Sequence, residues 1–343
     1  MAPVTNARHI FTEIPTGLPE PGKHIAHDTS RTIDLENEPL NGGFLVKTLI
    51  LAIDPYMRMK MRDASIKSYS PAYALGEPLY GYGIGRVLRS EDSALKPGDH
   101  IYGLIPHEEY FVRQDPKQYV SLENEYNLPW SLYVGVLGMP GQTAYIGWKE
   151  FSKAKSGETA FVTTAAGAVG SFVVQLAKLN GLKVIASSGS DDKVAFAKAA
   201  GADVSFNYKK ESTKEVLDRE GPIDVYWDNV GGETLDLALA AANEYARFIE
   251  CGMASQYNES ERYGIKNAIF FVTKSLSMNG FIVSKLLHKH AADFYHEVPK
   301  LVKDGKIQFE EDLKRGLDQV GQGLRDISDG KNQGKVVIVV ADS

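Results

Sequence analysis

Residues 161–171 read FVTTAAGAVGS, a short apolar run followed by a turn of small residues. The turn nearly matches the G-x-G-x-x-G pattern that holds a dinucleotide pyrophosphate: Gly167 and Gly170 take the second and third glycine positions, and Ala165 takes the first. Small residues let the backbone approach the pyrophosphate, whose charge the N-terminus of the following helix favours. Because Ala165 replaces a glycine, we expect the turn to be made there without a positive φ. The competing interpretation is a corner of small residues that only packs a helix on a strand.

The segments around this turn alternate between strand-like and helix-like patterns. We predict strands at 161–164, 183–188, 202–208, 223–232 and 246–252, and helices at 168–181, 191–201, 210–220 and 233–242. Gly181 and Gly201 stand where helices commonly end. Strands that alternate with helices of this length predict βαβ units and a parallel sheet.

The segments on both sides of this alternation have a different pattern. Residues 1–135 are rich in strand and turn signals, with strands predicted at 42–53 and 78–90 and a Pro-Gly turn followed by a short strand within 95–105, which is typical of a compact β-barrel unit. Near the C-terminus we predict a helix and then a glycine turn within 293–308, a second helix at 317–330 and the strand KVVIVV at 335–340. This last strand need not belong to the parallel sheet and can return to the first domain.

The composition limits the class of protein. A chain of 343 residues is too long for one comfortable core and predicts two domains. No apolar run approaches the roughly 18 residues of a membrane span, and the N-terminus lacks the apolar core of a signal peptide. The net charge of −6 argues against nucleic acid as a partner. The single cysteine, Cys251, allows neither an internal disulfide nor a multi-thiolate metal site, which favours a cytoplasmic location.

The second predicted strand indicates the cofactor. In NAD-binding domains an acidic residue about 20 residues past the glycines binds the ribose 2′-hydroxyl. Here that region offers Ser187, Ser188, Ser190 and Lys193, with no carboxylate at the strand tip. Asp191 and Asp192 follow, in the first turn of a helix that can point them outward. Hydroxyls and a lysine suit a 2′-phosphate, so we predict NADP(H); the alternative for Lys193 is an ordinary solvated lysine.

Six longer motifs resemble a known family. GMPGQTAY (138–145), AAGAVGS (165–171), GSDDKVAFAKAAGADVSFNYK (189–209) and DNVGG (228–232) resemble the medium-chain dehydrogenase/reductase superfamily. AIDPYMRMKM (52–61) and GEPLYGYGIG (76–85) narrow the resemblance to the zinc-independent branch of prostaglandin and alkenal double-bond reductases. This implies an α/β fold in which a Rossmann domain, residues 136–309, with a doubly wound parallel sheet, is inserted in a GroES-like, partly open β-barrel domain, residues 1–135 and 310–343. The cofactor is then expected in the cleft between them.

The resemblance also implies which residues contact NADPH. They are Ala166, Gly167, Ala168, Val169 and Gly170 at the pyrophosphate; Ser188, Lys193 and Tyr208 near the 2′-phosphate; and Met139, Thr143, Asn229, Cys251, Gly252, Ser255, Tyr257, Phe281, Ile282, Val283 and Asn332 elsewhere. For Asn229 the alternative is a cap on the helix that begins near Gly231 or Glu233.

No metal is expected. A catalytic zinc needs about three protein ligands, and the Gly-His-Glu motif of the superfamily's zinc enzymes maps onto Gly81 and Tyr82, so its histidine is missing. We interpret His100 and His107 as ordinary polar residues.

Tyrosines are then the candidates for the chemistry. A phenol is protonated at neutral pH and can donate a hydrogen bond to a developing enolate. We predict Tyr56, Tyr80 and Tyr257 as catalytic residues and Tyr56, Tyr80 and Tyr82 as substrate-binding residues, against the alternative that each packs in a core or cleft. Some relatives carry a candidate catalytic tyrosine at a position that is Thr273 here.

These observations predict an NADPH-dependent enzyme that reduces the C=C bond of α,β-unsaturated aldehydes and ketones. Hydride goes to the β-carbon, and a tyrosine or the nicotinamide ribose hydroxyl stabilises the enolate. A quinone or carbonyl reductase and a non-catalytic NADPH-binding protein are the alternatives. A small-molecule substrate and a homodimer follow from the resemblance.

Overall fold

The structure is a computed structural model that describes residues 2–259 and 261–342. It divides into two compact units, residues 1–135 with 311–343 and residues 136–310. Glu310, which we assigned to the first domain, therefore groups with the second unit, because the strand that returns to the first unit begins at Glu311.

A six-stranded sheet forms the centre of the second unit. Its order is β12 (Val204–Asn207), β11 (Lys183–Ser188), β10 (Thr159–Val162), β13 (Ile223–Asp228), β14 (Ala242–Glu250) and β15 (Ser277–Gly280). All neighbouring strands run parallel. Numbered along the chain the order is 3-2-1-4-5-6, which is the Rossmann order, so the predicted parallel sheet is confirmed.

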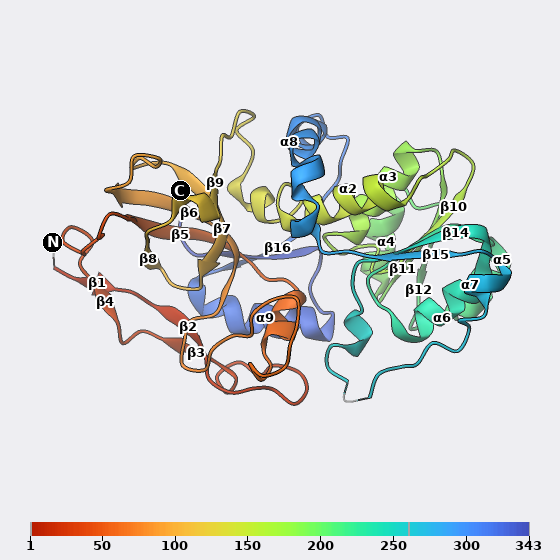
Figure 1. The fold of residues 1–343 in the computed structure, drawn as a ribbon, viewed down its shortest axis with the longest axis horizontal. Helices are drawn as coiled ribbons and strands as arrows, with labels where there is room; N and C mark the ends of the chain where they lie inside the picture. Colours follow the sequence, from red (N-terminus) through yellow and green to blue (C-terminus); the bar gives the residue numbers. More distant parts are fainter. Residues whose placement is uncertain (1, 260, 343) are drawn as a thin grey trace. The chain divides into compact units, whose positions relative to one another are not determined.

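Helices cover both faces of this sheet. They are α2 (Met139–Phe151), α3 (Gly170–Leu179), α4 (Asp191–Ala199), α5 (Thr213–Glu220), α6 (Gly232–Ala241), α7 (Phe270–Thr273) and α8 (Leu287–Lys303). In Figure 1, α2 and α3 lie on one side of the sheet and α6 and α7 on the other. The rings of Phe161, Tyr226 and Phe248 pack side by side on three neighbouring strands, and Leu235 and Leu239 of α6 join the same core. Within the described ranges, no helix combines the length and the apolar character that a bilayer crossing requires.

Several predicted boundaries are wrong, and α2 was not predicted. α3 begins at Gly170 rather than 168 because the preceding residues form the turn, and it ends before Gly181, which has a φ of +77°. α8 begins at Leu287 rather than 293. α2 contains glycines that weaken helix propensity, but Gly141 is required: a Cβ there would lie 1.8 Å from the Val136 carbonyl oxygen.

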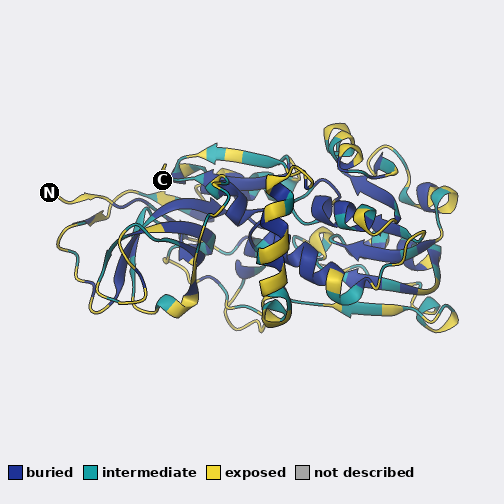
Figure 2. Cartoon of the chain, turned by 90° about the horizontal axis from the view of Figure 1, so that it is seen from above, coloured by how far each residue is buried: buried dark blue, intermediate teal, exposed yellow. Residues whose placement is uncertain are grey.

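The first unit is built on a seven-stranded sheet. Its order is β16 (Glu311–Arg315), β17 (Lys335–Val339), β5 (Phe44–Ala52), β6 (Tyr80–Ser90), β7 (His100–Pro106) and β9 (Tyr119–Ser121), and β8 (Tyr110–Arg113) also pairs with β5. Two small sheets pair β1 (Val4–Thr5) with β4 (Thr32–Ile33) and β2 (Arg8–Phe11) with β3 (Ile25–Asp28), and α1 (Tyr56–Lys60) and α9 (Val320–Asp329) are the helices. Short 3-10 turns lie at Pro116–Gln118, Trp130–Val134, Ala254–Gln256, Val283–Lys285 and Leu317–Gln319. Figure 2 shows the strands of both units largely buried.

The C-terminal strand belongs to the first unit, as predicted. β17 pairs antiparallel with β5, and a buried ion pair holds its first residue: Lys335 Nζ lies 2.7 Å from Asp54 Oδ1 and donates to the Ile53 carbonyl at 2.6 Å. Both side chains are nearly inaccessible, at 4% and 6% exposure. Removing one partner of a buried pair leaves an uncompensated charge. The ion pair therefore stabilises the attachment of the C-terminal strand to the segment that follows β5.

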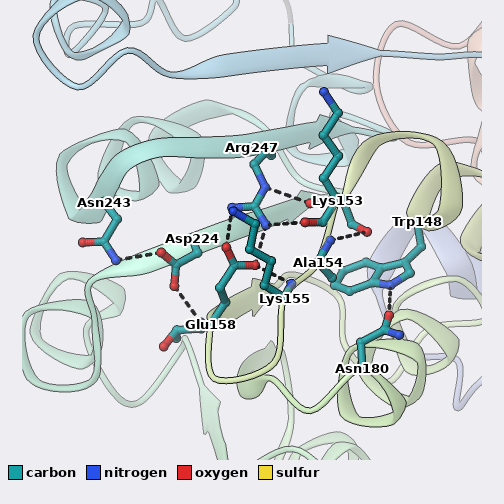
Figure 3. Close-up of polar contacts among 11 residues, drawn as sticks. Trp148, Lys153, Ala154, Lys155, Glu158, Asn180, Asp224, Asn243 and Arg247 are labelled. Atoms are coloured by element: carbon teal, nitrogen blue, oxygen red, sulfur yellow. Dashed lines mark hydrogen bonds and ion pairs between the residues drawn. The ribbon is translucent and has the colours of Figure 1, made fainter.

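A polar network fixes the amino-terminal end of the Rossmann sheet (Figure 3). Arg247 of β14 pairs with Glu158 through both carboxylate oxygens, at 2.9 and 2.5 Å. Asp224 of β13 accepts a hydrogen bond from the Thr159 N–H at 2.8 Å and another from Asn243 at 2.8 Å. These contacts hold the starts of β10 and β13 at the end of the sheet opposite the small-residue turn.

Candidate functional site

The turn between β10 and α3 places its unusual backbone conformation one residue earlier than a regular fingerprint would. Ala165 has no positive φ, as expected, but Thr164 does, with φ +52°. The Ala165 N–H donates to the Ser187 carbonyl at 3.0 Å, and the Gly167 N–H donates to the Thr164 carbonyl at 2.9 Å. A non-glycine residue with positive φ is uncommon and persists only where the surroundings hold it. Thr164 thus replaces the first glycine as the residue that turns the chain.

The second and third glycines of the turn lie against its backbone. A Cβ on Gly170 would lie 2.3 Å from the Thr164 carbonyl oxygen, so only glycine fits. On Gly167 a Cβ would lie 3.1 Å from the Thr164 methyl carbon. Within residues 2–259 and 261–342, no chain acceptor pairs with the backbone N–H groups of Ala166, Ala168 and Val169. These donors precede α3, whose N-terminus favours an anion, so the turn fits a pyrophosphate.

Thr163 and Asn229 join the two strands at which the sheet order reverses. Asn229 Nδ2 donates to the Thr163 carbonyl at 2.7 Å, and Thr163 Oγ1 accepts from the Asn229 N–H at 2.8 Å. The alternative that Asn229 caps α6 is wrong, because its side chain is used in this cross-strand pair. Asp228 instead receives the loop N–H groups, from Val230 at 2.7 Å and Gly231 at 2.8 Å. In open α/β sheets ligands bind beside such a reversal.

The predicted 2′-phosphate residues gather at the carboxyl ends of β11 and β12. Tyr208 lies over Gly189, since a Cβ there would lie 2.9 Å from the Tyr208 hydroxyl. Ser188 Oγ is buried and finds no hydrogen-bond partner within the described part of the chain. Burial lowers the pKa of Lys193; nearby Lys209 lowers it further, and Glu310 opposes the change. The two lysines lie close enough for their charges to interact, and such a pair suits an anionic ligand.

Two neighbours of this cluster have structural roles. Ser190, which we counted among the phosphate hydroxyls, instead caps α4 by accepting from the Lys193 N–H at 3.4 Å. Asp191 pairs with Lys210 and accepts from Asn207 at 2.9 Å. Its charge is therefore compensated by these partners, whereas Asp192 beside it is exposed.

The other predicted cofactor residues of the second unit lie in three places. In α2, Thr143 Oγ1 donates to the Met139 carbonyl at 2.7 Å.

The loop after β14 carries two of these side chains. Ser255 Oγ donates to the Val230 carbonyl at 2.6 Å. Tyr257 Oη accepts from the Met253 N–H at 3.3 Å, and it lies 3.1 Å from where a Cβ of Gly252 would be. After β15, the Phe281 ring packs on Trp227 and Phe151, and Ile282 and Val283 follow. Asn332, in the first unit, donates to the Gly334 carbonyl at 2.8 Å.

A buried carboxyl pair, which the sequence did not reveal, lies at the carboxyl ends of β13 and β14. Asp228 and Glu250 are register partners, and both oxygens of Glu250 are buried. Burial, and then the charge of Asp228, raise the pKa of Glu250 to about 9; burial also raises the pKa of Asp228. Two carboxylates cannot both ionise at such a site, so the pair holds a proton at neutral pH. Burial and both carboxyls raise the pKa of Cys251 to about 12, which keeps the thiol protonated.

The candidate tyrosines of the first unit lie in two aromatic groups, Tyr56 with Tyr82 and Tyr80 with Tyr73. The Tyr56 and Tyr82 rings meet edge to face at 6.3 Å, and Tyr82 stacks on Tyr102 at 5.5 Å. Tyr56 Oη is enclosed, and burial raises the pKa of Tyr56 well above its usual value. Tyr80 Oη instead accepts a hydrogen bond from Lys60 Nζ at 2.8 Å. Lys60 lies in the motif at 52–61, but the sequence predicted no role for it.

Two further expectations concern Thr273 and metal ligands. Thr273 is exposed, and its hydroxyl donates to the carbonyl of Ile269, the residue before α7, at 3.4 Å.

Across residues 2–259 and 261–342, no three His, Cys, Asp or Glu side chains are grouped so that they could ligate a metal ion. The described residues do not fit a zinc site, and no step below uses one.

The carboxyl pair predicts a pH dependence of stability. A carboxyl group whose pKa rises on folding holds its proton more tightly in the folded chain, so stability falls as pH rises from the ordinary value of 4.5 toward about 9. Glu250→Gln removes this loss. We expect its thermal unfolding midpoint, measured by calorimetry, to exceed that of the native chain by a margin that grows from about pH 5 to about pH 9.

Glu244→Gln is the matched control, because Glu244 is an exposed residue of the same strand. Its curve should run parallel to that of the native chain. A Glu250→Gln margin that stays constant with pH would contradict the shared proton.

Two family models match the chain. The model described as "Zinc-binding dehydrogenase" matches residues 168–303, and that described as "N-terminal domain of oxidoreductase" matches residues 9–122. The chain is 40% identical to the NADP-dependent oxidoreductase RED1 of Cochliobolus heterostrophus, over 98% of each chain. It is 38% identical to the 2-alkenal reductase (NADP(+)-dependent) of Nicotiana tabacum, also over 98% of each.

Among solved structures, CurA from Vibrio vulnificus in complex with NADPH superimposes with a TM-score of 0.87 at 28% identity, covering 98% of this chain and 100% of that one. The match runs through both units and agrees with the predicted GroES-like and Rossmann domains. The chain belongs to the medium-chain dehydrogenase/reductase superfamily, in its double-bond reductase branch.

Proposed function

We propose that the chain is an NADPH-dependent reductase of the C=C bond of α,β-unsaturated aldehydes and ketones. The observation that carries the proposal is the turn at 163–170, whose N–H groups suit an anion, together with a predicted 2′-phosphate region that contains Lys193 and the buried Ser188 hydroxyl. The 38% identity to a 2-alkenal reductase along nearly the whole chain supports the substrate class. The bound NADPH in CurA supports the cofactor.

The second unit holds the cofactor in this proposal. The free N–H groups of the turn and the N-terminus of α3 bind the pyrophosphate, and Lys193, Tyr208 and Ser188 bind the 2′-phosphate and its ribose. The loop 251–257 and the backbone at 281–283 line the remainder of the cofactor. When bound, NADPH supplies a hydride to the β-carbon of the substrate.

The first unit supplies hydroxyl groups for the charge that then develops on the substrate. A phenol that donates a hydrogen bond to the carbonyl oxygen stabilises the enolate more than the neutral ketone. Tyr80 and Tyr82 are the proposed donors of this unit, because the Tyr56 hydroxyl is enclosed. Tyr257 of the second unit accepts the N–H of Met253 and keeps its own proton, so it is a further candidate donor. The nicotinamide ribose hydroxyl is the alternative donor.

The product identifies the reaction. With NADPH and a small enone, we expect consumption of NADPH well above background, with the saturated ketone as the product and its carbonyl intact. Chromatography with mass detection separates the outcomes. An allylic alcohol indicates a carbonyl reductase, turnover only with quinones indicates a quinone reductase, and no turnover across a panel of enals, enones and quinones indicates a binding protein; each contradicts the proposal.

Lys193→Ala tests the choice of NADPH. A charge-assisted hydrogen bond contributes about 1.5–3 kcal/mol, so we expect the KM for NADPH to rise about tenfold or more while the KM for NADH stays within twofold. Lys198→Ala, an exposed lysine of the same helix, is the control and should change neither value. An equal loss for both cofactors would falsify the 2′-phosphate role.

A homodimer and a cytoplasmic location are part of the proposal. β15 lies at the edge of the Rossmann sheet, and near it Ile269 and Val272 are 62% and 77% exposed. An open strand edge and exposed apolar side chains suit a second copy of the chain. Light scattering of the purified chain should give twice the chain mass, and Val272→Asp should shift it toward the single-chain mass. A monomeric native chain contradicts the dimer.

A further inference from the structure

Lys60 is a buried cation that contacts a phenol. It ends α1 and is 3% exposed. Its Nζ donates to the Pro71 carbonyl at 2.9 Å and to Tyr80 Oη at 2.8 Å. Among the residues that the structure describes, no carboxylate pairs with it. Burying an ammonium costs several kcal/mol unless polar groups replace water, and here one of the two replacements is a candidate catalytic hydroxyl.

Three contacts with Tyr73 and Lys60 hold Tyr80, which is still partly accessible. It begins β6, and the hydroxyl of Tyr73 donates to its carbonyl at 2.7 Å. The Tyr73 ring packs edge-on against the Tyr80 ring at 5.1 Å. Lys60 Nζ completes the set at the hydroxyl. A side chain fixed in this way needs little reorganisation when it reacts.

The contact sets the direction of the Tyr80 proton. An ammonium only donates, so Tyr80 Oη accepts from Lys60 and directs its own proton elsewhere. The same ammonium stabilises the phenolate more than the phenol, because the hydrogen bond to an anion is charge-assisted.

Other charged and titratable groups surround the pair. Burial, and then Arg62, lower the pKa of Lys60 to about 8. Burial raises the pKa of Tyr80, and Arg62 opposes this change. Tyr73 faces both groups and is itself influenced by Asp54 and Tyr69. Lys60 therefore carries a charge at neutral pH and loses it in mildly alkaline solution.

We propose that Lys60 is a positioning residue that makes Tyr80 the proton donor of the reduction. This rests on the proposed function. After hydride addition, the Tyr80 O–H bond breaks and a C–H bond forms at the α-carbon of the enolate. The electron pair stays on Tyr80 Oη as a phenolate that the Lys60 ammonium holds, and water returns the proton.

A titration without substrate tests the pair directly. The near-ultraviolet absorbance of a protein with Tyr80, minus that of the same protein with Tyr80→Phe, reports the ionisation of Tyr80. This difference is measured in the native chain and in each Lys60 variant. Because Lys60 and Tyr80 are in hydrogen-bond contact, they titrate as a coupled pair whose first step falls near the pKa of Lys60. Lys60→Gln keeps a donor but removes the ammonium, and we expect it to raise the lowest pH at which the Tyr80 absorbance changes by one pH unit or more. Lys60→Arg keeps the charge and should leave this pH near the native one.

Lys67→Gln is the control for the loss of one lysine charge, because Lys67 is exposed in the neighbouring loop; it should not move the Tyr80 titration. Circular dichroism checks the fold of each variant, and Lys60→Met, which keeps the aliphatic stem, replaces Lys60→Gln if that variant does not fold. If the Tyr80 titration of Lys60→Gln is the same as that of the native chain, the proposed effect of Lys60 on Tyr80 is wrong. This result is independent of whether enones are substrates, so it is distinguishable from failure of the proposed function.

Kinetics test the role in the reaction. With an enone, Tyr80→Phe and Lys60→Gln should lower kcat tenfold or more while the KM for NADPH stays unchanged. Lys60→Arg should restore kcat and shift the alkaline fall in rate, expected near pH 8 for the native chain, to higher pH. A Lys60→Gln variant with native kcat overturns the positioning role even if its Tyr80 titration has moved.

Discussion

The hydrogen bonds between Thr163 and Asn229 hold the carboxyl ends of β10 and β13 at a fixed separation. The sheet order reverses between these two strands, so the loops that follow them run in opposite directions and open a ligand site. One loop becomes the small-residue turn before α3, and the other carries Asp228 and the N-terminus of α6. The polar network around Arg247 fixes the other end of the same strands. The positions of the turn before α3 and of the loop at 228–231 depend on this paired end.

At this carboxyl end of the sheet, the close packing of the two loops requires strained and buried groups. Gly170 leaves no room for a Cβ against Thr164, and Thr164 itself adopts a left-handed conformation. Asp228 receives two loop N–H groups while it lies beside Glu250, and burial raises the pKa of both carboxyls. Because Asp228 also holds the loop, the protonation of this carboxyl pair links the loop to the pH dependence of stability. The first unit uses a comparable arrangement, in which a buried Lys60 is placed against Tyr80.

Much of the fold was predictable because it follows from local periodicity. Alternating β-branched strands and capped helices specify βαβ units whatever surrounds them, and the glycines after α3 and α4 have the expected positive φ. α2 and β15 were missed for a physical reason: glycines in α2 and the short, polar sequence of β15 give weak local signals. Their stability comes from neighbours, as at Gly141 against Val136 and in the pairing of β15 with β14.

The sequence by itself determined the two-part organisation, the small-residue turn and the lack of a carboxylate at the tip of the second strand. Each of these depends on residues close together in the chain. Only the tertiary structure decided which hydroxyl meets a cation, which carboxyls share a proton and which candidate tyrosine is enclosed. Lys60 and Tyr80, like Asp228 and Glu250, are about 20 residues apart in the chain and meet only through strand pairing and packing, a separation at which no spacing rule connects them.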